Sequence, residues 1–289
     1  MQYKPLVFIL SILLLTSLAC GVTINLPVSD VKTGPTVTEE IVVPEIESTE
    51  PVDLMIEFGA GELNIQPGAE NALVTGTVSY NIVDFKPDVL VEGNQVHLST
   101  GNLEIKGIPI INTGDFKNEW DLQLGNSPMN LSVSAGAYNG NIELGGLSLL
   151  SVRFTDGAAE VDVQFSELNQ VEMDTLRYET GASSVELRGL ANTNAASVIF
   201  KGGAGDYRLD FSGDLQRDMD VTVDSGMSNV EIIVPRGVTA RVLYDGGLSN
   251  VDLSGDWEKT GNDYYQEGTG PRLTINVNIG AGNLSLSNR

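Results

Sequence analysis

Carboxylates at one position of a repeated seven-residue phrase are the residues of this sequence best suited to chemistry. The phrase begins with glycine and closes with an apolar, a polar and an apolar residue, as in Gly157-Ala-Ala-Glu-Val-Asp-Val163 and Gly226-Met-Ser-Asn-Val-Glu-Ile232. If the copies stack as parallel strands, their polar residues point outward about 5 Å apart. This column reads, from copy to copy, Glu143, Asp162, Glu186, Arg208, Glu231 and Asp252.

Stacked carboxylates together with turn carbonyls could supply the six to eight oxygens that Ca²⁺ prefers. The weak candidate metal ligands are therefore Asp162, Glu186, Glu231 and Asp252. The alternative is a solvated polar face, and we favour it because no segment matches the Gly-Gly-x-Gly-x-Asp calcium repeat. A second polar column of mixed sign lies two residues before the phrase and comprises Thr155, Glu179, Lys201, Asp224 and Asp245.

Other catalytic constellations are scarce. The chain has one histidine and one cysteine, which excludes thiolate–imidazole pairs and His-rich zinc sites. His97 alternates with Val96 and Leu98 and is expected on a strand surface. We therefore predict no catalytic residue and no cofactor. Four aromatic residues could either form a carbohydrate-stacking platform or cap the ends of a repeat array, with capping favoured: Trp120, Trp257, Tyr264 and Tyr265.

The charge balance limits the partners. The sequence holds 16 basic and 39 acidic residues, a net charge of −23. Nucleic-acid binding and electrostatic attachment to anionic lipid both rely on Lys and Arg, so neither is expected. A soluble, self-repelling surface follows.

The elements that must position these residues are short strands. Five copies of the phrase start 24, 22, 23 and 21 residues apart, and a second alternating segment lies between successive copies. We predict an all-β fold, a β-solenoid or β-roll of about 21–24 residues per repeat. Each phrase glycine is expected at a turn with positive φ, where the backbone of the next repeat passes close by. Further copies at Gly59 and Gly280 bracket one repeat domain over residues 53–289.

Two segments interrupt the repeats, residues 66–130 and 254–270. The first predicts a strand over 72–80 and a hairpin across Gly93-Asn94. Both segments are interpreted as insertions into a single stack.

The N-terminus is typical of a processing signal. Lys4, an apolar run over residues 6–15 and Cys20 after a small residue resemble a bacterial lipoprotein signal, which predicts a signal peptide over residues 1–19 and lipidation of Cys20. The alternatives are an ordinary signal peptide and an uncleaved anchor. Residues 20–52, acidic and rich in Pro and Thr, are expected to form a tether; alternatively, their Val and Ile residues add an edge strand. The expected partners are a membrane, through the lipid, and an envelope polymer or protein.

These features together resemble the toast-rack family of bacterial cell-envelope domains. The resemblance rests on the repeated phrases, on Trp120-Asp-Leu-Gln-Leu124 and on the Gly202–Gly213 segment, and covers about residues 52–289. The sequence is also similar to LiaF-like domains linked to responses to cell-wall-active antibiotics and to adhesin-like domains. The resemblance implies an all-β envelope domain without catalytic residues.

The sequence therefore predicts an exported, lipid-anchored, non-catalytic module that serves binding, adhesion or an envelope-stress response. The alternative is an enzyme acting on envelope glycans, which needs two carboxylates about 5 to 9 Å apart in a cleft.

Overall fold

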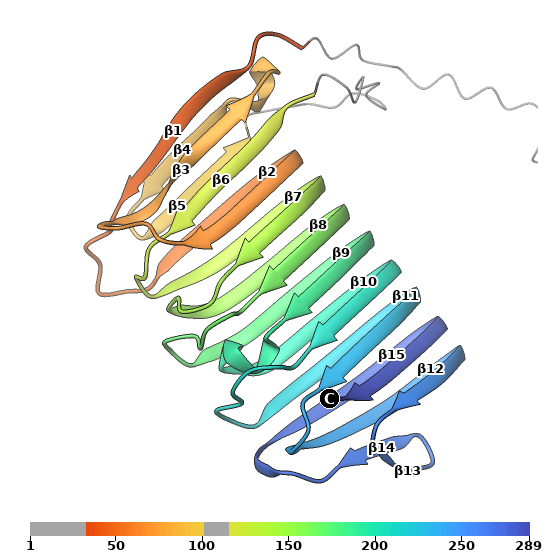
Figure 1. The fold of residues 1–289 in the computed structure, drawn as a ribbon. Coiled ribbons are helices and arrows are strands. Elements are labelled where there is room, and N and C mark those ends of the chain that lie inside the picture. The colour runs from red at the N-terminus through yellow and green to blue at the C-terminus, as the bar shows by residue number, and fades with distance from the viewer. Residues whose placement is uncertain (1–32, 101–115) are drawn as a thin grey trace, which may run out of the picture. The chain divides into compact units, whose positions relative to one another are not determined.

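The computed structural model describes residues 33–100 and 116–289 (Figure 1). The described residues belong to one compact unit. The predicted signal sequence, Cys20 and residues 20–32 of the predicted tether lie outside the described residues. The described part is all-β, as predicted, with two short 3-10 helices, η1 (Val83–Phe85) and η2 (Leu190–Thr193).

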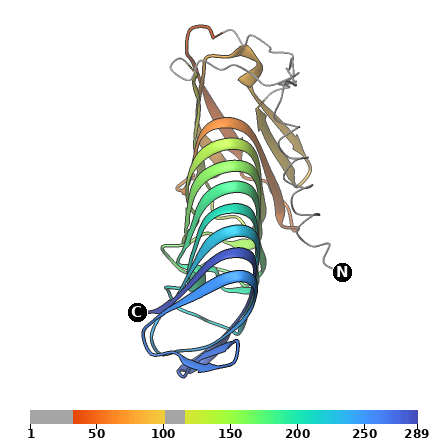
Figure 2. The same ribbon diagram turned by 90° about the vertical axis from the view of Figure 1, so that its right-hand side faces the viewer.

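The repeating unit is a long strand that bends at the phrase glycine, so that the repeats form a row of arches (Figure 2). From Val152 to the end of β8, the alternation of buried and exposed residues breaks only around Gly157. We call the segments before and after the bend the first and second arms. The glycine thus lies inside one continuous strand rather than in a turn between two. The described bent strands are β2 (Val52–Pro67), β7 (Met129–Glu143), β8 (Leu149–Gln164), β9 (Met173–Arg188), β10 (Ala195–Asp210), β11 (Met219–Val234), β12 (Val238–Ser254) and β15 (Thr269–Asn288).

Gly203 shows why the bend needs glycine. A Cβ at Gly203 would lie 2.4 Å from the carbonyl oxygen of Gly181 in the neighbouring strand, which confirms the predicted close approach. The predicted positive φ is wrong for Gly203 and for the other phrase glycines, none of which has it. At Gly203 the strand pairing continues on both sides and only that position is skipped. The positive φ occurs two residues later, at Gly205, with a value of 153°.

The core lies between the two arms. In β8, Val152 and Phe154 of the first arm and Val161 and Val163 of the second are all buried. Burial of one such side chain stabilises the fold by about 1.5–3 kcal/mol. Aromatic rings continue the packing from strand to strand: Phe154 stacks on Tyr178 with centroids 5.3 Å apart, and Tyr178 on Phe200 at 5.7 Å.

A buried carboxylate lies beside these rings. Asp156 is 8% exposed, and it accepts hydrogen bonds from the hydroxyls of Tyr178, at 2.6 Å, and Thr180. Burial, and next the charge of Asp156, raises the pKa of Tyr138 above its ordinary value and that of Tyr207 to about 12. Burial is also the main cause of the raised pKa of Tyr178.

The stacking order follows the chain except at its C-terminal end. Parallel neighbours run in the order β2-β7-β8-β9-β10-β11-β15-β12. The sequence implied that β12 follows β11, but β15 lies between them. The reason is that residues 254–270 form strands β13 (Glu258–Thr260) and β14 (Asp263–Gln266), and β14 occupies the other edge of β12. The returning chain therefore pairs with the edge of β12 that faces β11.

At the N-terminal end the two arms of β2 have different neighbours. The first arm pairs with β5 (Gln95–Thr100), which pairs with β4 (Pro87–Glu92). The second arm pairs with β6 (Asn118–Leu124), followed by β3 (Ala72–Tyr80) and β1 (Val37–Pro44). The predicted strand over 72–80 and the hairpin across Gly93-Asn94 are confirmed.

Strand β1 corrects the assignment of residues 37–44 to the tether. These residues pair antiparallel with β3, and Ile41 and Val43 are buried. Their alternating apolar side chains extend the core, which a solvated tether would leave exposed. Residues 37–44 therefore form an added edge strand, which was the alternative interpretation.

The aromatic residues occupy the two ends of the stack. Trp120 is fully buried against Phe58, with ring centroids 5.6 Å apart, and Tyr264 of β14 is buried at the other end. Buried rings are not available to stack on a carbohydrate. The structure therefore favours capping over a stacking platform at these two positions.

Candidate functional site

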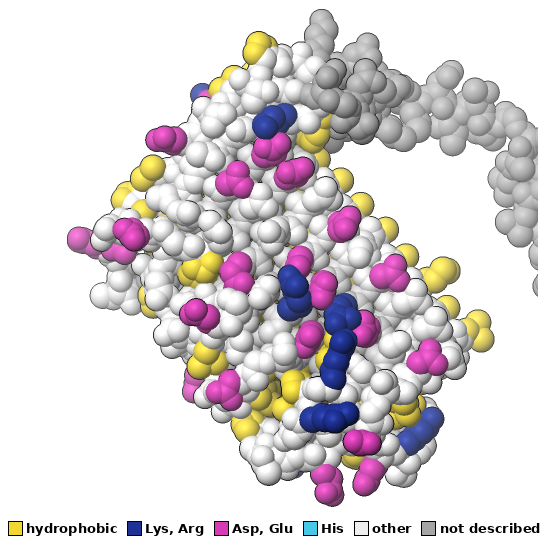
Figure 3. Space-filling view, in the orientation of Figure 1, with side chains coloured by type: hydrophobic (Ala, Val, Ile, Leu, Met, Phe, Trp, Pro, Cys, Tyr) yellow, Lys and Arg dark blue, Asp and Glu magenta, His cyan; other side chains and the backbone are white. Residues whose placement is uncertain are grey.

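The second arms together with β6, β3 and β1 present a continuous outward surface, which we call the polar face. A second arm has three outward positions, as Glu160, Asp162 and Gln164 show in β8. In β11 the third of them is Ile233, which is buried. Because all the strands are in register, these side chains form three columns across the stack. Figure 3 shows acidic side chains spread over this view and basic side chains gathered toward the C-terminal half.

The middle of these three columns corresponds to the column predicted from the sequence, and the observed register differs from that prediction at two points. Glu143 pairs with Gln164 in a neighbouring column, and Asn141 pairs with Asp162 in its place. The sequence concealed this because Gly140 holds the inward position where other copies have an apolar side chain. A Cβ at Gly140 would lie 2.7 Å from the Tyr138 ring, so the tyrosine fills that space.

The second change follows from the position of β15. Ser285 lies between Glu231 and Asp252, so these two carboxylates are not neighbours. The observed middle column reads Glu40, Thr77, Asp121, Asn64, Asn141, Asp162, Glu186, Arg208, Glu231, Ser285 and Asp252.

Arginines neutralise most of the candidate metal ligands. Arg208 lies 3.0 Å from the Glu186 carboxylate and also pairs with Glu231. Arg188, from the adjacent column, pairs with Asp162. In the part of the chain that the structure describes, no group of three or more His, Cys, Asp or Glu side chains is arranged to hold a metal ion.

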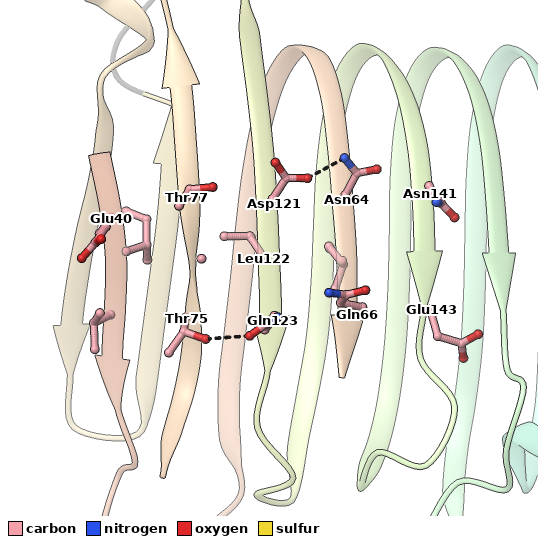
Figure 4. Close-up of a pocket in the computed structure, with 14 residues that line it drawn as sticks. Glu40, Asn64, Gln66, Thr75, Thr77, Asp121, Leu122, Gln123, Asn141 and Glu143 are labelled. Carbon is pink, nitrogen blue, oxygen red and sulfur yellow. Dashed lines mark hydrogen bonds between the residues drawn. The ribbon is translucent and has the colours of Figure 1, made fainter. Parts of the chain in front are cut away.

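The N-terminal half of the polar face contains a hollow, whereas the arginine–carboxylate pairs just described lie on β8 to β11. A depression of about 690 Å³ lies over β1, β3, β6, β2 and β7 (Figure 4). Asn64 donates a hydrogen bond to Asp121 at 2.8 Å, and Thr75 donates to Gln123 at 3.4 Å. Glu40, Gln66, Asn141 and Glu143 add further donors and acceptors. A second depression of about 460 Å³ shares Asn64 and Asn141, so the hollow continues toward β9.

The second predicted column lies on the opposite face, on the first arms. Lys201 pairs in register with Glu179 and with Asp224, as the sequence predicted, whereas Asn278 separates Asp224 from Asp245. Glu179 accepts a hydrogen bond from Arg177 at 2.5 Å, and this bond holds the pKa of Glu179 below its ordinary value. Lys201 and Arg208 therefore belong to the two different faces of one strand.

His97 is half-exposed on β5, where its Nε2 lies 3.1 Å from the Glu57 carboxylate. This position fits the predicted surface histidine.

Sequence reasoning missed the part of the polar face formed by β1, β3 and β6. These strands carry no copy of the phrase, and β3 runs antiparallel to both of its neighbours. The available signal was the alternation of Asp121 and Gln123 with the buried Trp120, Leu122 and Leu124.

None of the helices within the described ranges has the length and apolar content needed to span a bilayer. Cys20, the predicted lipidation site, lies outside those ranges.

Comparison with known families identifies the chain. Residues 32–188, just over half of its length, match the family described as the N-terminal domain of toast_rack, DUF2154. The chain therefore belongs to this family, and the resemblance predicted from its repeats is confirmed. No curated protein matches the chain.

Comparison with solved structures finds matches to bacterial proteins. A candidate cell adhesion protein from Clostridium sporogenes is 18% identical, with a TM-score of 0.51 over 88% of this chain and 100% of its own. A candidate adhesin from Parabacteroides merdae is 12% identical, with a TM-score of 0.38 over 89% of this chain and 99% of its own. At this identity the Clostridium structure supports the fold alone.

Proposed function

We propose that the protein is a non-catalytic adhesion module of the bacterial envelope that binds a hydroxyl-rich polymer, such as an envelope glycan, along the polar face. The observation that carries this proposal is the continuous hollow lined by amide, hydroxyl and carboxylate groups in register. A linear polymer repeats along its length, and in-register strands repeat the same kinds of group about every 4.8 Å.

The chemistry of the lining favours neutral or cationic glycans. Asn64, Gln66 and Asn141 provide both donors and acceptors, while Asp121 and Glu143 accept hydrogen bonds from sugar hydroxyls. Polyanions are disfavoured, because the chain carries a net charge of −23. The description of the Clostridium protein as a candidate cell adhesion protein accords with this role.

Anchoring is the second half of the proposal. Lipid attached to Cys20 would hold the module on the outer side of a membrane, and more than one acyl chain gives firm attachment. A role in envelope stress is an extension of the same setting.

Binding is tested by co-sedimentation of the full-length protein, in detergent, with insoluble envelope glycans. The triple variant Asn64→Ala, Asp121→Ala, Gln123→Ala should lower the bound fraction at least tenfold. The matched control, Thr222→Ala with Asn276→Ala, removes outward polar groups from paired first arms on the opposite face and should bind like the parent. Equal losses in both variants would show that the polar face is not the binding surface. Release of soluble sugar from the bound glycan would overturn the non-catalytic assignment.

Anchoring is tested separately by metabolic labelling with a radioactive fatty acid. The parent and a Ser17→Ala control should incorporate the label, and Cys20→Ser should not. Label retained in Cys20→Ser would refute lipidation at this residue.

A further inference from the structure

Strand β4 is an edge strand with an unusual exposed surface. Among the described residues it pairs only with β5. Its three central residues are all exposed although all are apolar: Val89 at 39%, Leu90 at 50% and Val91 at 48%. An open apolar edge of this kind is a template for another strand unless the protein protects it.

The edges that β1 and β13 form in the same sheet are protected. Strand β13 has only three residues, of which Glu258 and Lys259 are charged. Strand β1 contains Glu39 and Glu40 and ends at Pro44. Short length, charge and proline are the features that block strand addition, and the centre of β4 has none of them.

The two sides of β4 differ. Val89 lies opposite Leu98, and Val91 lies opposite Val96. Leu98 and Val96 are fully buried, so both valines lie on the core side of the sheet, where no described strand beyond β4 continues the core. An added strand with apolar residues on this side would extend the core by one strand.

On the outer side of β4, an apolar residue lies between two carboxylates along the strand. Leu90 pairs with His97, which pairs with Met55, and these three residues line a depression of about 450 Å³. Asp88 and Glu92, two residues to either side of Leu90, point to the same outer side. A strand that is added here meets an apolar centre with one negative charge at each end.

We propose that β4 is a docking edge for an extended segment of a partner protein with the pattern basic–apolar–apolar–apolar–basic, which adds to the sheet by main-chain hydrogen bonds. Its basic residues lie opposite Asp88 and Glu92, and its first and third apolar residues cover Val89 and Val91. A second copy of this chain is disfavoured as the occupant. Antiparallel self-pairing centred on Leu90 sets Asp88 of one copy against Glu92 of the other, and the net charge of −23 adds repulsion. This surface is distinct from the polar face, and the proposal does not depend on polymer binding.

The probe is the peptide acetyl-Thr-Lys-Val-Leu-Val-Lys-Thr-amide, which has the same order of residues in both directions. We expect it to bind the full-length protein in detergent, measured by fluorescence anisotropy of a labelled form. N-methylation of alternate residues along one peptide edge should weaken binding at least tenfold, because it removes main-chain donors without changing side chains. If peptides N-methylated along either edge bind as tightly as the unmodified peptide, strand addition is refuted.

A charge exchange keeps the test independent of folding defects. The variant Asp88→Lys, Glu92→Lys should bind the lysine peptide at least tenfold more weakly and should recover binding to the same peptide with Glu in place of both Lys. The control Glu258→Lys on β13 should bind the lysine peptide like the parent. Failure of the exchanged pair to recover would overturn the proposed register. Dimerisation of the unliganded protein that Leu90→Lys abolishes would assign the edge to a second copy instead.

Discussion

Two constraints act on Gly205: a positive φ and the close approach of a neighbouring strand. Gly205→Ala should therefore destabilise the fold more than alanine at a glycine that has only one of them. Gly205 has φ of 153°, and a Cβ there would lie 1.8 Å from the carbonyl oxygen of Ser183. Backbone of this kind costs a side-chain-bearing residue about 1–3 kcal/mol. The contact adds to that cost, because neither strand can move without breaking its ladder on the far side.

Two other glycines separate these constraints. Gly237 has φ of 84° with nothing within 4 Å of its added Cβ, so Gly237→Ala measures backbone strain alone, at about 1 kcal/mol. Gly203 has no positive φ but the 2.4 Å approach to Gly181, so Gly203→Ala measures overpacking, at about 1–3 kcal/mol. Gly205→Ala combines both and should cost about 4 kcal/mol or more.

The assay is urea unfolding followed by far-UV circular dichroism, which reports on strands throughout the stack. The expected order of unfolding midpoints is parent, Gly237→Ala, Gly203→Ala and Gly205→Ala, from highest to lowest. If Gly205→Ala unfolds at the same urea concentration as Gly237→Ala, the close approach of neighbouring strands contributes nothing, and the account of the bend is wrong.

Three further outcomes are expected. Unfolded tyrosines ionise near pH 10, whereas the raised pKa values keep Tyr138, Tyr178 and Tyr207 protonated in the folded state. Their contribution to the free energy of unfolding should therefore be constant below pH 10 and fall above it, by about 1.4 kcal/mol per pH unit for each tyrosine. Urea titrations at pH 9 and 11 check this, and an unchanged midpoint would contradict it. Asp156→Ala should cost about 2–4 kcal/mol, because it removes the acceptor of the buried Tyr178 hydroxyl and of the part-buried Thr180 hydroxyl. A thermal shift equal to that of an exposed control, Asp220→Ala, would argue against the network. Millimolar Ca²⁺ should raise the melting temperature no more than Mg²⁺ does at equal ionic strength. The reason is that Arg208 and Arg188 already pair with three of the four candidate metal ligands. A shift of several degrees that is specific to Ca²⁺ would show that the middle column binds the ion.

The sequence contained enough to predict the repeat architecture. Strict alternation, glycine at a fixed position and a period in the twenties occur together only when each unit buries one side against its neighbours. The predicted strand over 72–80 and the hairpin at Gly93-Asn94 follow from equally local signals, and both are confirmed. The capping interpretation of Trp120 and Tyr264 rested on the same need to cover the last strand of a stack.

The composition of each surface column could not be predicted from the sequence, because it depends on which strand lies beside which. A glycine at an inward position hid the correct alignment of Asn141, and the placement of β15 separated Glu231 from Asp252. Likewise, the apolar run Val89-Leu90-Val91 predicts a strand, but it does not reveal that β4 pairs with only one of the described strands.

By itself, the sequence determined the kind of strand, the bend and the spacing, because these depend on side chains a few residues apart. Only the tertiary structure decided the neighbours: β15 lies between β11 and β12, β1 pairs with β3 at one edge of the sheet, and β4 pairs with β5 at another. The physical reason is that backbone hydrogen bonds between strands are the same for every sequence, so the order of strands is chosen by the connections and the end caps.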